Sequence, residues 1–229
     1  MQASITHCGF NDVAAESKAA TCQAEGKKVQ QCTVCGKKVE TVLPKGEHTW
    51  GEASAEAGRA EGKVGYKTRE CTTCHTKDLF IDAADANSVV TGSKKSSTDG
   101  TVKLSANGNH IDYVVTLPAA MTNVTVAING WVDYFKDGSN NNEARGFFSR
   151  KEGDGPNVEV KLNGVAVEIT NHKTYEEMGM KSRESGTDST FALCELGTVA
   201  SLAAGDLTIT YTRLESYNLN IDGIHFLYK

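Results

Sequence analysis

The sequence lacks a membrane-spanning run, a basic stripe and a signal peptide. A membrane helix needs about 20 mostly apolar residues, and no apolar run among the 229 residues approaches that length. The formal net charge is −5 with Lys and Arg scattered along the chain, which argues against nucleic-acid binding. Residues 1–10 lack the basic and apolar regions of a secretory signal. We expect the chain to be a piece of a larger protein.

Motifs of the common enzyme classes are also missing. There is no Gly-x-Ser-x-Gly elbow, no phosphate-binding loop and no His-Glu-x-x-His motif. A glycosidase needs two carboxylates across a cleft, and the acidic residues show no recognisable arrangement. We therefore expect no enzymatic activity and no catalytic residues.

Apolar side chains are scarce in the first third of the chain. Only twelve of the first 78 residues are Ile, Leu, Val, Met, Phe, Trp or Tyr, whereas six of the seven cysteines lie within the first 74. A segment this poor in core material needs a metal or disulfides. Alternating apolar and polar residues begin near Asp78. We expect a cysteine-rich domain over residues 1–77 and a β-rich domain over residues 78–229.

A degenerate repeat of about 40 residues divides the cysteine-rich segment. The copies span residues 7–36 and 48–75, and each has a His, a Glu-Gly turn and a Cys-x-x-Cys pair. Repeats of this size form tandem small units. Two thiolates two residues apart suit adjacent corners of a zinc tetrahedron.

One or two structural zinc ions are therefore expected. The first copy offers a complete ligand set, His7, Cys22, Cys32 and Cys35. The second offers His48, Cys71 and Cys74, with His75 as a possible fourth ligand, because Gly58-Arg59-Ala60 stands where a cysteine should fall. Two alternatives are disulfide pairing and c-type haem attachment at residues 71–75. The charged neighbours of residues 71–75 disfavour haem, which needs an apolar pocket.

The repeat resembles zinc-ribbon-like tandem modules of large surface proteins in Gram-positive bacteria. The matching residues are Gly46-Glu47-His48-Thr49-Trp50, Ala20-Thr21-Cys22 and Cys32-Thr33-Val34-Cys35-Gly36. The resemblance covers about residues 5–76. It implies a spacer or interaction module with an extracellular or cell-surface location.

The second domain reads as short strands separated by turns. Alternating patterns predict strands over 110–117, 123–132, 157–162, 165–170, 206–213 and 219–228. Asn163-Gly164 predicts a hairpin, and residues 173–180 suggest a helical turn. Short strands without long helices indicate an all-β sandwich or barrel.

Five motifs in order resemble carbohydrate-binding modules of families six and thirty-five. They are Phe80 to Ala86, Gly108 to Pro118, Leu162-Asn163-Gly164, Leu202 to Ile209 and Asn220 to Ile224. The resemblance covers residues 79–229 and implies a jelly-roll β-sandwich that binds a glycan or polysaccharide. It also implies a calcium ion, here near Asp85 and Asp222, whose carboxylates are suitable hard ligands.

Sugar binding is expected at the loop end of this sandwich. Strand 110–117 turns back near Pro118, so the loop after residue 132 should lie beside the loop that leads to Asn220. Aromatic rings stack on sugars and amides bind their hydroxyls, which selects Tyr217, Asn220, Trp131, Tyr134 and Phe147 as candidates. Trp131 could equally be core. The alternative function is a protein-binding adhesin or spacer module.

Overall fold

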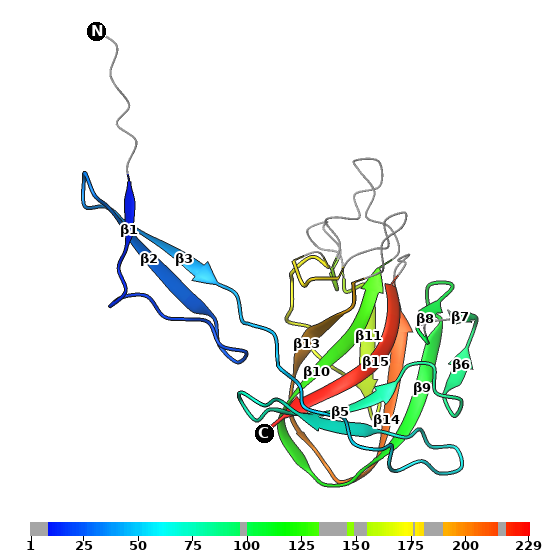
Figure 1. Cartoon of the computed structure of the whole chain (residues 1–229). Helices are drawn as coiled ribbons and strands as arrows, with labels where there is room; N and C mark the ends of the chain where they lie inside the picture. Colours follow the sequence, from blue (N-terminus) through cyan, green and yellow to red (C-terminus); the bar gives the residue numbers. More distant parts are fainter. Residues whose placement is uncertain are drawn as a thin grey trace. The chain divides into compact units, whose positions relative to one another are not determined.

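The computed structural model describes residues 9–96, 100–132, 146–148, 155–175, 177–180, 190–214 and 219–229. Within these ranges the chain is all β and contains no helix. No helix in this part of the chain is long and apolar enough to cross a membrane. Figure 1 labels most of the strands. They are β1 (Phe10–Asp12), β2 (Gly26–Cys32), β3 (Lys38–Leu43), β4 (Lys67–Glu70), β5 (Lys77–Asp82), β6 (Val89–Thr91), β7 (Lys94–Ser96), β8 (Val102–Leu104), β9 (His110–Leu117), β10 (Met121–Val132), β11 (Val158–Leu162), β12 (Val165–Ala166), β13 (Ala192–Leu202), β14 (Gly205–Arg213) and β15 (Leu219–Tyr228).

The chain forms two compact units. The first contains residues 1–51 and 71–75, and the second contains residues 52–70 and 76–229. In the first unit β1, β2 and β3 form an antiparallel sheet in that order. Val29 and Cys32 of β2 are buried there, whereas Val39 and Val42 of β3 are exposed. A sheet with so few buried side chains needs a further source of stability.

The second unit is a sandwich of two antiparallel sheets with jelly-roll topology. One sheet contains the order β13-β10-β15-β5, and the other the order β12-β11-β14-β9. Successive strands from β9 to β15 alternate between the sheets, apart from the β11–β12 hairpin. The short strands β4 and β6 extend the two sheets beside β5 and β9, and β8 pairs with β15 and with β7. The all-β sandwich expected from the sequence is confirmed.

Period-two patterns fix the strands around the core. In β9 every second residue is buried, from Ile111 to Leu117, and β14 pairs with it from Gly205↔Leu117 to Thr212↔His110. Asn163 and Gly164 have φ angles of 49° and 80° between the paired residues Leu162 and Val165. Both angles lie in the left-handed region that the predicted two-residue hairpin requires.

Several strands differ from the sequence-based expectations. The strand predicted over residues 165–170 is limited to Val165–Ala166. Strand β13 was not predicted, because a bulge opposite Val126 and Ala127 interrupts its alternation at Gly197. The helical turn expected over residues 173–180 is represented by one backbone hydrogen bond, from the Met178 N–H to the Thr174 carbonyl at 3.0 Å. The described part of this segment forms turns and a bridge between Thr174 and Gly146, not a longer helix.

The two units are divided differently from the boundary expected between residues 77 and 78. Residues 52–70, which belong to the second repeat by sequence, pack with the sandwich. Val64 is wholly buried in the sandwich core, and its N–H donates to the Val114 carbonyl at 2.8 Å. A single buried valine in a polar segment gives little sequence signal, which explains the difference.

Candidate metal centre

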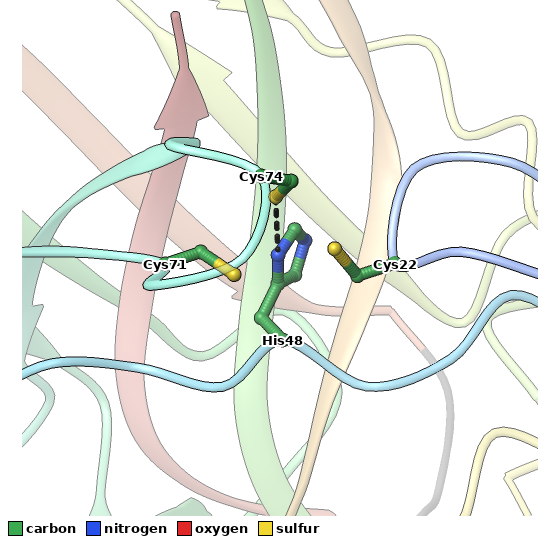
Figure 2. Close-up of side chains that lie close together, drawn as sticks. All are labelled: Cys22, His48, Cys71 and Cys74. Atoms are coloured by element: carbon green, nitrogen blue, oxygen red, sulfur yellow. Dashed lines mark hydrogen bonds between the residues drawn. The ribbon is translucent and has the colours of Figure 1, made fainter.

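Four potential metal ligands meet in the first unit. Their ligand atoms all lie within 4.8 Å of one another, and they belong to Cys22, His48, Cys71 and Cys74. Figure 2 shows the three sulfurs and the imidazole ring facing a common point. Cys22 and Cys71 are buried. Three thiols and one imidazole form a ligand set that suits a thiophilic metal ion.

Backbone hydrogen bonds bring Cys22 and His48 together. Thr21 begins a tight turn, in which its Oγ1 accepts from the Ala24 N–H at 3.0 Å and its N–H donates to the Ala24 carbonyl at 2.9 Å. The Gly46 N–H donates to the Thr21 carbonyl at 3.1 Å. This last bond holds the segment that carries His48 beside the turn that carries Cys22.

The second pair of ligands lies on a knuckle that is tied to the same segment. The His75 N–H donates to the Cys71 carbonyl at 3.0 Å and closes the turn, while the Thr72 N–H donates to the Thr49 carbonyl at 2.8 Å. His75 has a φ of 59°, so its backbone ends the knuckle in the left-handed conformation. It is not part of the ligand group. His75 was expected as a possible ligand, and the structure gives it a backbone role instead.

The surroundings of the cluster shift the pKa values of two of its thiols in opposite directions. Desolvation tends to raise the pKa of Cys71, but hydrogen bonds from the Cys74 backbone, His48 and the Thr73 backbone outweigh it and lower the pKa to about 5. The thiol of Cys74, together with desolvation, raises the pKa of Cys22 to about 11. Cys74 Sγ also lies 3.4 Å from His48 Nδ1. Without metal, the cluster therefore favours one thiolate at Cys71 and a proton on Cys22.

The first repeat does not assemble the ligand set expected of it. Cys22 joins the ligands of the second repeat, Cys32 is disulfide-bonded, and Cys35 is free and exposed. His7 lies outside the described residues. The expected grouping was wrong because linear spacing cannot show that a ligand crosses from one repeat to the next.

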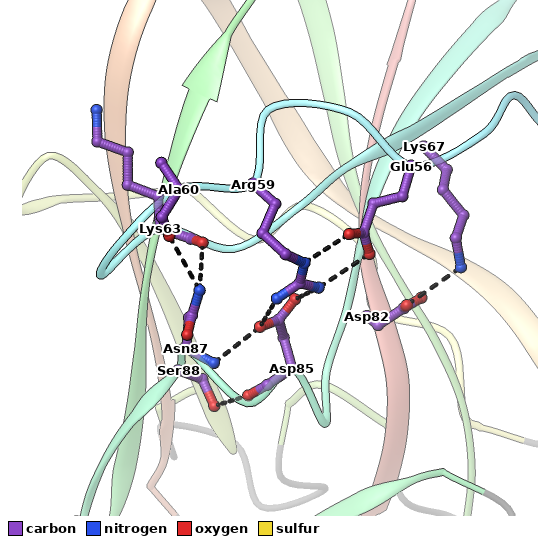
Figure 3. A network of polar contacts seen from close by, with 9 residues as sticks. All are labelled: Glu56, Arg59, Ala60, Lys63, Lys67, Asp82, Asp85, Asn87 and Ser88. Atoms are coloured by element: carbon purple, nitrogen blue, oxygen red, sulfur yellow. Dashed lines mark hydrogen bonds and ion pairs between the residues drawn. The ribbon is translucent and has the colours of Figure 1, made fainter.

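The expected calcium ligands are already engaged. Figure 3 shows the Asp85 carboxylate facing the guanidinium group of Arg59, whose Nη1 and Nη2 lie 3.0 and 2.6 Å from the carboxylate oxygens. Asp222 instead accepts from Asn129 Nδ2 at 3.0 Å. Within the described ranges, no group of three acidic side chains is close enough to share an ion. Arg59 stands at the position where the second repeat lacks a cysteine.

The described sugar-site candidates lie deeper than expected. Trp131 and Asn220 are directly opposite each other on β10 and β15, but only 9% and 5% of their surfaces are exposed. Phe147 is wholly buried and packs edge-on against Tyr175, so it belongs to the core and was wrongly assigned to a stacking platform. Tyr134 and Tyr217 lie outside the described residues.

Comparison with known proteins finds weakly similar solved structures. No protein-family model and no curated protein matches the chain. Two similar solved structures are catalytic domains of a GH87 alpha-1,3-glucanase. The nigerose complex has a TM-score of 0.36 at 13% identity over 65% of this chain and 27% of the glucanase chain. The D1068A variant in complex with tetrasaccharides has a TM-score of 0.37 at 12% identity. This match covers 66% of this chain and 28% of the glucanase chain. At TM-scores below 0.5 these likenesses say nothing about function.

Proposed function

We propose that the first unit binds one structural zinc ion through Cys22, His48, Cys71 and Cys74. The convergence of these four ligand atoms carries the proposal. Zinc bonds of about 2.0–2.3 Å in a tetrahedron place neighbouring ligand atoms roughly 3.3–3.8 Å apart, so only small adjustments are needed. Four protein ligands leave no open position for a substrate, and a structural role follows.

Zinc would stabilise a unit that has little apolar core. The ion would join three chain segments, namely the turn at Cys22, the segment at His48 and the knuckle at residues 71–74. Binding energy at such a site contributes directly to folding, since the unfolded chain has no preformed site. Removing the metal is therefore expected to unfold the first unit.

Metal counting in the full chain tests this proposal. Native mass spectrometry of non-reduced protein should show one zinc ion per chain, and Cys71→Ser and Cys22→Ser should each lose it. Cys194→Ser is the matched control, because Cys194 is a buried free thiol of the sandwich and its variant should keep the metal. Retention of zinc in both Cys71→Ser and Cys22→Ser would exclude this ligand set.

We also propose a function for the sandwich. It binds a glycan without catalysis and is a module of a larger secreted or surface protein. The ordered sequence motifs and the jelly-roll topology support this proposal. The pairing of Trp131 with Asn220 puts an indole and an amide side by side at the end where β10 stops and β15 starts. Trp131 Nε1 has no hydrogen-bond partner among the described residues. An indole N–H in this state suits a sugar hydroxyl.

A glycan array probed with the full chain tests the second function. Trp131→Phe keeps an aromatic ring but removes the N–H donor, so affinity for a captured glycan should fall about 2- to 10-fold. Val165→Thr, at an exposed position of β12, is the control and should bind as the wild type does. If the array captures no glycan, the adhesin alternative takes its place.

A further inference from the structure

The two Cys-x-x-Cys knuckles have the same backbone geometry but hold their thiols in different states. In the first, the Gly36 N–H donates to the Cys32 carbonyl at 3.0 Å, and in the second the His75 N–H donates to the Cys71 carbonyl at 3.0 Å. Gly36 and His75 both have left-handed φ angles, 72° and 59°. The sulfurs of one turn can therefore be compared with those of the other.

The first knuckle does not join its own two cysteines. Cys32 is disulfide-bonded, but Cys35 is free, although its N–H donates to Cys32 Sγ at 3.5 Å. The disulfide of Cys32 therefore leads out of the knuckle. Because the second knuckle has the same geometry, we expect its cysteines, Cys71 and Cys74, to pair with a cysteine outside it and not with each other.

Cys22 is the outside cysteine that the second knuckle contacts. The ligand atoms of Cys22, Cys71 and Cys74 lie within 4.8 Å of one another, and Figure 2 shows the three sulfurs around the ring of His48. The Cys22 thiol hydrogen-bonds to the thiols of Cys74 and Cys71, and its contact with Cys74 is the stronger. Thiols in contact need only a small adjustment to form a disulfide.

The three thiols differ in their access to an oxidant. Cys71 is wholly buried and Cys22 is 8% exposed, whereas Cys74 is only partly buried. The oxidation of a thiolate depends on its exposure, so an oxidant from solvent reaches Cys74 first. Cys22 is then the thiol that lies closest to the oxidised sulfur and outside its knuckle.

We propose that the cluster is a redox switch, in which a two-electron oxidant such as hydrogen peroxide joins Cys22 to Cys74 and releases the metal. The pairing of the sulfurs does not depend on the zinc ion proposed above, whereas metal release rests on it. A disulfide sulfur is not a thiolate ligand, so the oxidised cluster keeps only His48 and Cys71 as ligands. Two protein ligands are too few for a structural zinc site.

The reaction balances with peroxide as the oxidant. The Cys74 thiolate attacks one peroxide oxygen, the O–O bond breaks, and hydroxide leaves while Cys74 becomes a sulfenic acid. The Cys22 thiolate then attacks that sulfur, the S–S bond forms, the S–O bond breaks, and a second hydroxide leaves. Two protons from solvent convert both hydroxides to water. The two sulfurs together lose the two electrons that reduce the peroxide.

Metal and disulfide are then alternative cross-links between the same two segments. The zinc ion would join the turn at Cys22 to the knuckle at residues 71–74, and the disulfide joins the same turn to the same knuckle. A disulfide stabilises a fold mainly by restricting the unfolded chain. The first unit should therefore stay folded after oxidation, whereas removal of the metal from the reduced protein should unfold it.

The test maps disulfides in the full chain before and after treatment with hydrogen peroxide. Free thiols are blocked with iodoacetamide in denaturant, and the peptides of a non-reducing digest are identified by mass spectrometry. A chromophoric chelator measures the released zinc in parallel. The oxidised wild type should contain a disulfide between Cys22 and Cys74 and release one zinc ion per chain. A dithiol should restore both thiols and the metal binding.

Three variants make the assignment specific. Cys22→Ser should form no disulfide at Cys74. Cys71→Ser should hold no zinc before oxidation but should still join Cys22 to Cys74. Cys35→Ser is the control, because it removes the exposed free thiol of the first knuckle, and it should form the same disulfide as the wild type.

The outcomes separate this inference from the zinc proposal. A disulfide between Cys71 and Cys74 or between Cys22 and Cys71, or no new disulfide at all, would overturn the switch, as would zinc that stays bound after Cys22 and Cys74 have joined. Loss of the disulfide in Cys35→Ser would also overturn it, since the bond would then require the first knuckle. If the wild type holds no zinc before oxidation, the zinc proposal fails, but a disulfide between Cys22 and Cys74 would still establish the pairing.

Discussion

Arg59 lies against Asp85 with two guanidinium nitrogens facing two carboxylate oxygens, at 3.0 and 2.6 Å. The Asp85 side chain is 1% exposed and that of Arg59 is 41% exposed. Arg59 also contacts Glu56. Asp85 additionally accepts from the Asn87 N–H at 2.8 Å. This network fastens residues 56–63 to the sandwich, and it uses a segment whose repeat counterpart carries the ligand Cys22.

The ion pair makes the sandwich sensitive to acid. Burial tends to raise the pKa of Asp85, but Arg59 outweighs it and holds the pKa below its ordinary value of 3.8. The stabilisation is therefore complete above pH 3.8 and is lost as pH falls through the lower folded value. As pH falls from 3.8 to that folded value, the unfolding free energy of the wild type should drop faster than that of Asp85→Asn, as measured by urea titration. Asp12→Asn, in the first unit, should leave the acid response of the sandwich unchanged.

Zinc affinity should rise with pH. The pKa of Cys22 is raised to about 11, so its thiol is protonated near neutrality and must lose its proton to bind metal. Each proton released makes the apparent affinity about tenfold stronger per pH unit. Competition with a chromophoric chelator at pH 6, 7 and 8 measures this slope. A flat profile would mean that Cys22 is not a ligand.

Val64 should contribute to the stability of the sandwich, although it lies in the second repeat by sequence. It is wholly buried in the core of the second unit, so Val64→Ala should lower the unfolding free energy by about 1–3 kcal/mol. Val165→Ala, at a position 71% exposed, should change it by less than about 0.5 kcal/mol. Equal effects of the two substitutions would show that residues 52–70 do not pack on the sandwich.

Asn220 should affect stability as well as binding. Its side chain is buried on β15, so Asn220→Ala should cost about 1–3 kcal/mol of unfolding free energy, because a buried hydrogen-bonding group loses its partner. Asn11→Ala, at an exposed position of β1, is the control and should have little effect. Thermal melts measure both. An unchanged melting temperature for Asn220→Ala would mean that the amide makes no structural contribution.

Sequence patterns predicted the strands that bury one face. The alternation of residues 110–117 gave β9 its observed bounds, and Asn163-Gly164 gave the turn of the β11–β12 hairpin. These features depend on local chemistry, namely period-two burial and left-handed backbone angles. Strand β13 was not predicted, because Gly197 lies at a bulge where the alternation of buried and exposed residues is interrupted.

The ligand group was only partly predictable, because it depends on long-range pairing. All four residues were recognised as metal ligands, but Cys22 was grouped with Cys32 and Cys35 by its position in the repeat. The structure shows that Gly46 hydrogen-bonds to Thr21 and carries His48 to Cys22. The sequence marked the position of Arg59 only by the absence of the cysteine expected there. Its partner Asp85 lies 26 residues away, so the pair could not be recognised from spacing.

The chain leaves the first unit after Gly51, returns to it for residues 71–75 and leaves again at Thr76. A single recombination crossover therefore cannot transfer one unit without removing part of the other. A crossover near residue 77 would strip Val64 and Arg59 from the sandwich, and one near residue 51 would separate His48 from Cys71. Gene shuffling is therefore expected to move the two units together, as one inherited cassette.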